Sequence, residues 1–482
     1  MSEALRRAGR GWWWLAAALA GLAAVLPVAG WALVGAALVI VFREWAAGRG
    51  GFAALWLVGF GYFLGQFHWI VEPFLVDIAA HGWMAPFALV LMAGGGALFW
   101  GLAGALARRA RPASALMLAL MLIAAEVTRS LILTGFPWGL LGHTLIDTRP
   151  AQLAAVGGPH LLTALVVLVP WGIAALLARS RAAASGGAAL AALAVLWPVP
   201  EAALTGRDAP VIRLVEPDAP QDEKWAPDKR QIFLDRMLEA TRAAPAPDLI
   251  VWPETAVPQL LNYADLSLGA MAAAAGDVPV VAGVNRAEGD RYYNSLILLD
   301  GGAVTQVYDK RHLVPFGEYI PFGALAARLG IVPLNVVAGF SKGQGSALVD
   351  LPGIGPARAL ICYEAIFAEE IATDTRPRLL LVISNDAWFG TGAGPRQHSQ
   401  QARLRAIEQG LPVVRVANRG VSAVIDGRGQ IVAPVRSLGP YGRDVALPPA
   451  LAPTPYGRWG DWPLLAVLAL GLITCCLRPR RM

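Results

Sequence analysis

The sequence ARALICYE, at residues 357–364, passes from a mainly apolar run to a cysteine that is followed two residues later by an acid. An apolar run of this length predicts a buried β-strand, which places Cys362 at its carboxyl end. Open α/β sheets bind their substrates at that edge. We expect a helix to follow and to lower the pKa of the thiol. Cys362 is therefore a candidate nucleophile, although a lone cysteine is more often a small buried hydrophobe.

Two other charged residues follow predicted strands in the same way. Glu254 follows the strand in LIVWPETA (249–256), and Lys310 follows the strand in VTQVYDK (304–310). A carboxylate there can act as a general base toward a thiol or an amine. Arginine supplies most of the positive charge, so a lysine at a strand end suggests a need for a compact ammonium group. Only four of the 40 basic residues are lysines, at positions 224, 229, 310 and 342. The alternatives are a helix-capping acid and a solvated lysine.

These strands belong to a segment in which short β-rich runs alternate with polar helical stretches. The alternation predicts an α/β layered domain over residues 203–458. The predicted helices span residues 227–242, 365–371 and 397–409. The predicted strands span residues 211–215, 249–252, 278–284, 295–299, 304–308, 357–361, 379–383, 413–416 and 423–425.

The rest of the chain is too apolar for a wholly soluble protein. Hydrophobic residues make up 56% of the chain and charged residues only 15%, against a usual charged share of about 25%. This composition excludes a disordered chain, and three cysteines, two of them adjacent, exclude a disulfide scaffold. A bilayer core needs about 20 helical residues. We predict eight transmembrane helices near residues 12–27, 30–42, 52–69, 85–107, 114–134, 161–178, 186–200 and 461–477.

The arginines predict the orientation of these spans. With eight spans, most arginines outside the polar segment fall on one side, which predicts that both termini are cytoplasmic. The domains are then a seven-span domain at 1–202, an extracytoplasmic domain at 203–458, and a last span with a basic tail at 459–482. A cleaved signal peptide is the alternative for the first run. The arginines on the predicted cytoplasmic side are Arg6, Arg7, Arg10, Arg43, Arg49, Arg108, Arg109, Arg111, Arg179, Arg181, Arg478, Arg480 and Arg481.

Glu254, Lys310 and Cys362, in this chain order, resemble the Glu-Lys-Cys triad of the nitrilase, or carbon–nitrogen hydrolase, superfamily. Together with the predicted spans, further strings resemble the bacterial apolipoprotein N-acyltransferases within it. These strings are HLVPFGEYIPF (312–322), ICYE (361–364), ISNDAWFG (383–390) and TPYGRWGDWP (454–463).

The resemblance implies an αββα sandwich and an acyltransferase of the bacterial inner membrane that catalyses the last step of lipoprotein maturation. Glu254 would be the general base, Lys310 the oxyanion stabiliser, and Cys362 a nucleophile that carries a thioacyl intermediate. Membrane phospholipid would donate the acyl chain, and the α-amine of a diacylglyceryl-cysteine on an apolipoprotein would accept it. We expect no cofactor, no metal, no nucleic acid, and a monomer. The predicted supporting residues are Glu318, Tyr363, Glu364 and Trp225, from the resemblance, and Asn385 and Trp388, which would shape the pocket.

Other hypotheses compete with this one. A membrane-bound amidase that hydrolyses a carbon–nitrogen bond would have the same triad, and a transporter or scaffold would only bind. The apolar stretch at 320–340 predicts either a lid over the site or a core helix and strand. Glu126 and Arg129, one helical turn apart in the fifth span, predict a functional charge pair or a structural one. His398 is expected to be structural.

Overall fold

The chain forms two compact units, which are described separately. The first contains residues 1–200 and 454–482, and the second contains residues 201–453. The structure is a computed structural model that describes residues 3–26, 29–110, 113–201, 205–323 and 339–477, with side chains from residue 12 onward. Most of the predicted lid, at 324–338, and the C-terminal arginines lie outside the described residues.

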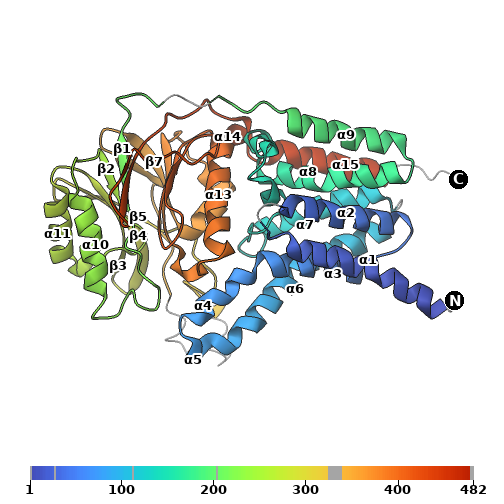
Figure 1. Cartoon of the computed structure of the whole chain (residues 1–482), viewed down its shortest axis with the longest axis horizontal. Helices are drawn as coiled ribbons and strands as arrows, with labels where there is room; N and C mark the ends of the chain where they lie inside the picture. The colour runs from blue at the N-terminus through green and yellow to red at the C-terminus, as the bar shows by residue number, and fades with distance from the viewer. Residues whose placement is uncertain (1–2, 27–28, 111–112, 202–204, 324–338, 478–482) are drawn as a thin grey trace. The chain divides into compact units, whose positions relative to one another are not determined.

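Each predicted apolar run overlaps a helix of the first unit (Figure 1). The helix at 154–177 continues across a kink at Gly157 and Gly158, whereas the predicted span at 161–178 begins after this kink. The long helices are α1 (Glu3–Ala23), α2 (Gly30–Ala46), α3 (Phe52–Gln66), α6 (Ala85–Arg109), α7 (Ala115–Leu131), α8 (Ala154–Leu177), α9 (Arg181–Leu196) and α15 (Trp462–Leu477).

Small residues let these helices approach closely. A Cβ atom on Gly61 or Gly65 of α3 would lie 2.3 Å from a backbone oxygen of α1, and one on Gly172 of α8 would lie 2.5 Å from Gly187 of α9. Gly61 and Gly65 are four residues apart, so they face the same neighbour. Close contact through small residues four apart is typical of helices that pack in a membrane.

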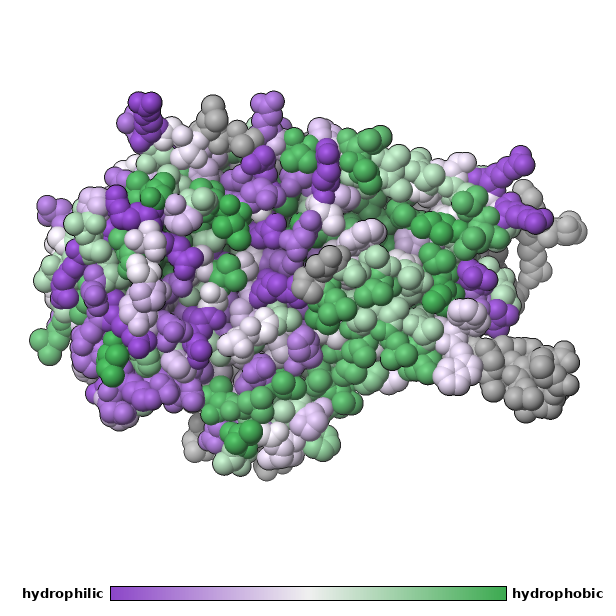
Figure 2. Space-filling view, viewed as in Figure 1, coloured by the Kyte–Doolittle hydropathy of each residue, from purple (hydrophilic) through white to green (hydrophobic). Residues whose placement is uncertain are grey.

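The eight predicted spans are not confirmed. Among the described residues, two helical stretches, 78–109 and 149–177, are long and apolar enough to cross a bilayer. The pair Phe52–Gln66 and His68–Leu75 adds a third if the two helices, bent by 61°, form one span. Several other helices have only 16 or 17 residues, fewer than the roughly 20 that a bilayer core requires. Figure 2 shows mostly apolar side chains over the helices of this unit on the face drawn.

Glu126 and Arg129 pair with each other inside the first unit. Arg129 Nη2 lies 3.1 Å from Glu126 Oε2, and both side chains are buried. Trp100 Nε1 donates to the other oxygen of Glu126 at 2.8 Å. Arg129 Nη1 donates to the carbonyl oxygens of Phe136 and Trp138. The polar atoms of this pair are thus satisfied by protein groups, which is the requirement for burying charges.

The second unit contains two β-sheets. In each sheet three neighbouring strands run parallel and are joined through helical segments, as predicted, whereas the other strands pair antiparallel. The seven-stranded sheet has the order β11 (Arg436–Ser437), β12 (Gly442–Ala446), β1 (Val211–Val215), β2 (Leu249–Val251), β3 (Val280–Glu288), β4 (Arg291–Asp300) and β5 (Ala303–Asp309). The five-stranded sheet has the order β10 (Ala423–Ile425), β9 (Val413–Asn418), β8 (Leu379–Asn385), β7 (Gly355–Ile361) and β6 (Leu348–Leu351).

The two sheets pack face to face, and helices cover their outer faces (Figure 1). The central core joins apolar residues of both sheets, such as Leu214, Leu296, Ile361 and Ile383. Helices α10 (Arg230–Arg242) and α11 (Asp265–Ala275) form a second core with the seven-stranded sheet, and α13 (Ala393–Gln409) forms a third with the other. This is the αββα layering that was expected from the resemblance.

Candidate active site

The structure brings the three predicted catalytic residues together at strand ends of both sheets. Glu254 follows β2, Lys310 follows β5, and Cys362 follows β7. All three side chains are buried. Lys310 Nζ lies 3.7 Å from Glu254 Oε1. The negative charge of Glu254 raises the pKa of Cys362, and the positive charge of Lys310 lowers it. The site therefore holds one acid, one ammonium group and one thiol.

The carboxylate of Glu254 is fixed through both oxygens. Asn294 Nδ2, on β4, donates to Oε1 at 2.7 Å, and the backbone N–H of Asn385, at the end of β8, donates to Oε2 at 2.7 Å. The two donors come from different sheets. They determine where the carboxylate points, as a general base requires.

A second acid, Glu318, holds the ammonium group of Lys310. Lys310 Nζ donates to Glu318 Oε1 at 2.9 Å, and the backbone N–H of Val314 donates to Oε2 at 2.8 Å. Asn294 Nδ2 also donates to Glu318, at 3.1 Å. Burial alone would lower the pKa of Lys310, but Glu318 and Glu254 outweigh it and raise the pKa above its ordinary value. Lys310 is therefore a permanent cation, suited to an oxyanion and not to proton transfer.

Cys362 occupies a sharp turn between β7 and a short 3-10 helix, η7 (Cys362–Ile366). Its φ of 52° lies in the left-handed region, which is uncommon for a residue with a side chain. The expected lowering of the thiol pKa is wrong for this structure. Burial, and next the charge of Glu254, raise the pKa of Cys362 above its ordinary value. One turn of 3-10 helix and the charge of Lys310 do not offset these two effects.

This raised pKa predicts the pH dependence of alkylation. Because the thiolate is the reactive form, the rate at which iodoacetamide alkylates Cys362 should rise about tenfold per pH unit up to about pH 10. An ordinary thiol, with a pKa of about 8.5, levels off earlier. The measurement is the labelled fraction of the Cys362 peptide by mass spectrometry, with glutathione as reference. A plateau at or below about pH 9, as an ordinary thiol gives, would contradict the raised pKa.

The residues that flank the nucleophile hold the loop that carries Lys310. Glu364 is fully buried, and its Oε1 accepts from the backbone N–H groups of Arg311 at 2.7 Å and His312 at 3.1 Å. Its Oε2 accepts from the N–H of Ile361 at 2.7 Å. Burial raises the pKa of Glu364. The ring of Tyr363 packs edge-on against His312. Glu364 therefore ties the residues after Lys310 to the strand that ends at Cys362.

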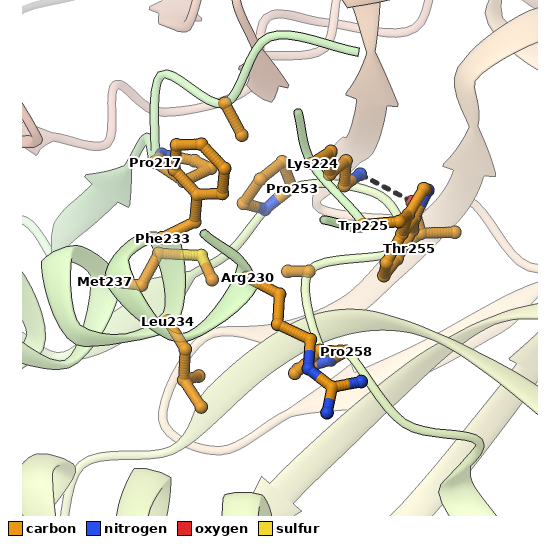
Figure 3. A pocket seen from close by; sticks show the side chains of 12 residues that line it. Pro217, Lys224, Trp225, Arg230, Phe233, Leu234, Met237, Pro253, Thr255 and Pro258 are labelled. Atoms are coloured by element: carbon orange, nitrogen blue, oxygen red, sulfur yellow. Dashed lines mark hydrogen bonds between the residues drawn. The ribbon is translucent and has the colours of Figure 1, made fainter. Parts of the chain in front are cut away.

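Trp225 lies beside a buried lysine behind Glu254. Lys224 Nζ donates to Thr255 Oγ1 at 2.7 Å and to the carbonyl oxygen of Glu254 at 3.2 Å, and it lies 5.1 Å from the centroid of the Trp225 ring. Burial lowers the pKa of Lys224 to about 8. Figure 3 shows Lys224, Trp225 and Thr255 at one side of a pocket, with Phe233 and Met237 of α10 at another. Trp225 is exposed.

Of the two residues predicted to shape the pocket, Asn385 has contacts that define its position. Its backbone holds Glu254, and its side chain bonds Gln221 at 2.7 Å and Asn418 at 2.8 Å. Trp388, on η9 (Asp386–Phe389), is exposed. Within the described part of the chain, no group of three His, Cys, Asp or Glu side chains could hold a metal ion.

Sequence analysis missed Asn294 and Lys224. The predicted strand at 295–299 begins one residue after Asn294, whereas β4 begins at Arg291 and places Asn294 inside the sheet. A polar residue within such a strand would have been the signal, because a buried amide needs partners. Lys224 carried the same signal as Lys310, since lysine is rare in this chain.

Known protein families match parts of both units. Residues 153–439 match the carbon–nitrogen hydrolase family, and residues 16–172 match the apolipoprotein N-acyltransferase N-terminal domain. A protein of Rhodopseudomonas palustris named apolipoprotein N-acyltransferase is 38% identical over 94% of this chain and 90% of its own length. A protein of the same name in Rhizobium leguminosarum bv. trifolii is 40% identical over 82% of this chain and 78% of its own length. Another, in Caulobacter vibrioides, is 38% identical over 88% of this chain and 85% of its own length. The chain belongs to the apolipoprotein N-acyltransferase family.

Proposed function

We propose that this protein transfers an acyl chain from a membrane phospholipid to the α-amine of the diacylglyceryl-cysteine of an apolipoprotein. The observation that carries the proposal is the buried site in which Lys310 lies between Glu254 and Glu318, next to Cys362. Family membership supports the class of reaction and the class of acceptor. No cofactor is required, because an acid, a cation and a thiol suffice for acyl transfer.

The first half of the reaction acylates the enzyme. Glu254 takes the proton of the Cys362 thiol as the sulfur bonds to the ester carbonyl carbon, and the carbonyl electrons move to the oxygen. Lys310 and a backbone N–H near Tyr363 stabilise this oxyanion. When the carbonyl re-forms, the carbon–oxygen bond to the glycerol breaks. Glu254 returns its proton to the leaving alkoxide, so the products are a thioester on Cys362 and a lysophospholipid.

The second half transfers the chain. The amine of the diacylglyceryl-cysteine attacks the thioester carbon, and Glu254 takes one proton from the nitrogen. The carbon–sulfur bond then breaks, and the proton returns to the sulfur of Cys362. The product is an amide, which is more stable than the thioester, so this half runs downhill. The raised pKa of Cys362 agrees with a resting thiol that loses its proton only during attack.

The membrane unit keeps both substrates in the bilayer. Each buried methylene group contributes about 0.8 kcal/mol, so neither acylated substrate would leave the membrane readily. We include in the proposal the eight spans, the cytoplasmic termini and an extracytoplasmic unit at 203–458. The apolar surface of the helical unit and the contacts through Gly61, Gly65 and Gly172 support a location in lipid.

The proposed orientation predicts the sites of proteolysis. Protease added to intact spheroplasts should cleave within residues 203–458, because these residues would lie outside the cytoplasmic membrane. The fragments should be mapped by mass spectrometry, and a cytoplasmic protein should be followed as a control for lysis. Cleavage of this unit only after lysis would place it in the cytoplasm and contradict the orientation.

The acceptor distinguishes acyl transfer from hydrolysis. Purified protein should be incubated with a phospholipid that carries a labelled acyl chain and with a synthetic diacylglyceryl-cysteine peptide. Label in an amide on the peptide, seen by mass spectrometry, is the expected result. An N-acetylated peptide, which has no free amine, is the matched control. Labelled free fatty acid in place of the amide, or release of ammonia from amide substrates, would favour the amidase.

A further inference from the structure

A second buried polar network lies directly behind the nucleophile. His398 on α13, Asp386 on η9 and Arg415 on β9 are all buried. Asp386 Oδ1 lies 3.0 Å from His398 Nδ1, and Arg415 Nη2 donates to Asp386 Oδ2 at 2.7 Å. Ser384 Oγ, at the end of β8, donates to Asp386 Oδ1 at 2.7 Å. The network thus joins three elements around one imidazole ring.

The network ends on the nucleophile. His398 Nε2 lies 3.2 Å from the backbone carbonyl oxygen of Cys362. A carbonyl oxygen can only accept, so Nε2 carries a proton. This holds whether Nδ1 donates to Asp386 or accepts from Arg415 Nη2, which lies 3.1 Å away. His398 therefore donates to Cys362 O in either protonation state.

This hydrogen bond holds a residue whose backbone is strained. The φ of Cys362 is 52°, and such a conformation persists only where the surroundings fix it. The surroundings leave the imidazole little freedom. A Cβ atom on Gly420 would lie 2.3 Å from Asp386 Oδ2, so the chain needs glycine there to admit the carboxylate. The carboxylate then orients the ring from the side opposite to Cys362 O.

We propose that His398, oriented by Asp386, is a positioning residue that holds the backbone of Cys362 in the left-handed turn and so aims the thiol between Glu254 and Lys310. The inference rests on the proposed function. His398 touches the carbonyl of Cys362 and not the reacting sulfur, so it acts through the geometry of the nucleophile. This positioning role differs from the structural role expected from the sequence, because removal of His398 should affect the reaction and not only the fold.

The test compares three variants of the full-length protein. H398A should lower kcat for acyl transfer about 100-fold with little change in KM, as a misplaced reacting group does. H398Q, whose amide can still donate toward Cys362 O, should recover at least about tenfold of that loss. Q401L is the control, because Gln401 lies on the same helix with its side-chain atoms buried and unbonded among the described residues. Q401L should leave kcat near the wild-type value.

A second measurement does not depend on acyl transfer. Iodoacetamide alkylation of the Cys362 peptide should lose its wild-type pH profile in H398A, and level off near the pKa of an ordinary thiol, because the thiol leaves its buried position beside Glu254. H398Q should keep the wild-type profile. A wild-type profile and turnover in H398A, or the same defects in Q401L, would overturn the proposal. Failure of the wild-type protein to acylate any amine would overturn only the proposed function.

Discussion

Replacement of Cys362 with alanine is expected to abolish acyl transfer, with a loss of at least about 10,000-fold in kcat. Neither Glu254 nor Lys310 is free to carry the acyl chain, because Lys310 forms ion pairs with both Glu254 and Glu318. The measurement is transfer of a labelled acyl chain to a diacylglyceryl-cysteine peptide. Alanine should fold normally, since it removes only one buried sulfur atom from the edge of the core.

The control for this variant is C476A, which removes an exposed cysteine from the same chain. C476A should retain wild-type transfer, and both variants should have the same melting temperature within a few degrees. Retained transfer in C362A would mean that the acyl chain passes directly from lipid to amine or through another residue. Retained biological function in C362A, without transfer, would favour the scaffold hypothesis.

Replacement of Lys310 with methionine is expected to have the second largest effect. It removes the cation of the oxyanion site, and loss of one such donor typically lowers kcat about 100- to 1000-fold. In the native protein, Lys310 Nζ lies 3.7 Å from Glu254 and 2.9 Å from Glu318. The substitution therefore also leaves these two carboxylates without their shared cation. Breaking a buried pair in this way costs about 3–5 kcal/mol of folding free energy. The melting temperature should therefore fall together with kcat.

Two further variants separate catalysis from folding. K310R keeps the positive charge and should recover most of the stability, but its planar guanidinium cannot replace a compact ammonium group, so kcat should stay low. K342M removes an exposed lysine and should change neither property. Normal kcat in K310M would contradict the oxyanion role. Normal kcat in K310R would show that only the charge is required.

The strand ends that carry the site could be predicted from the sequence because apolar runs ended abruptly at reactive residues. Glu254, Lys310 and Cys362 each follow such a run, and the structure places all three at strand ends. Strands β6 and β12 were missed, because LVDL and GRDVA contain acids that interrupt the apolar pattern. Helix α11 was missed because its run of alanines has almost no amphipathic periodicity.

The supporting contacts could not be predicted, because they join distant parts of the chain. Asn385 reaches Glu254 through its backbone N–H, which no side-chain pattern reveals. His398 was assigned a structural role because its sequence neighbours give no sign that it contacts Cys362 O. The raised pKa of the thiol follows from burial, which depends on packing, whereas the expected lowering considered only the helix that follows Cys362.

The number of spans is harder to predict than the presence of a membrane unit. Composition and hydropathy identify apolar helices, but helices α9 and α15 have only 16 residues each. Tilt, snorkelling side chains and local thinning of the bilayer decide whether such helices cross it, and these depend on neighbouring helices and on lipid. The number of spans therefore has to be measured in a bilayer.

The most direct test of the central claim is mass spectrometry of the peptide that contains Cys362 after incubation with phospholipid and no acceptor. We predict a mass increase of one acyl chain on Cys362, which hydroxylamine removes and which is lost when a diacylglyceryl-cysteine peptide is added. The E254Q variant should accumulate far less of this adduct, because no base takes the thiol proton. An unmodified Cys362 peptide in a preparation that is nevertheless acylating the acceptor would contradict the account.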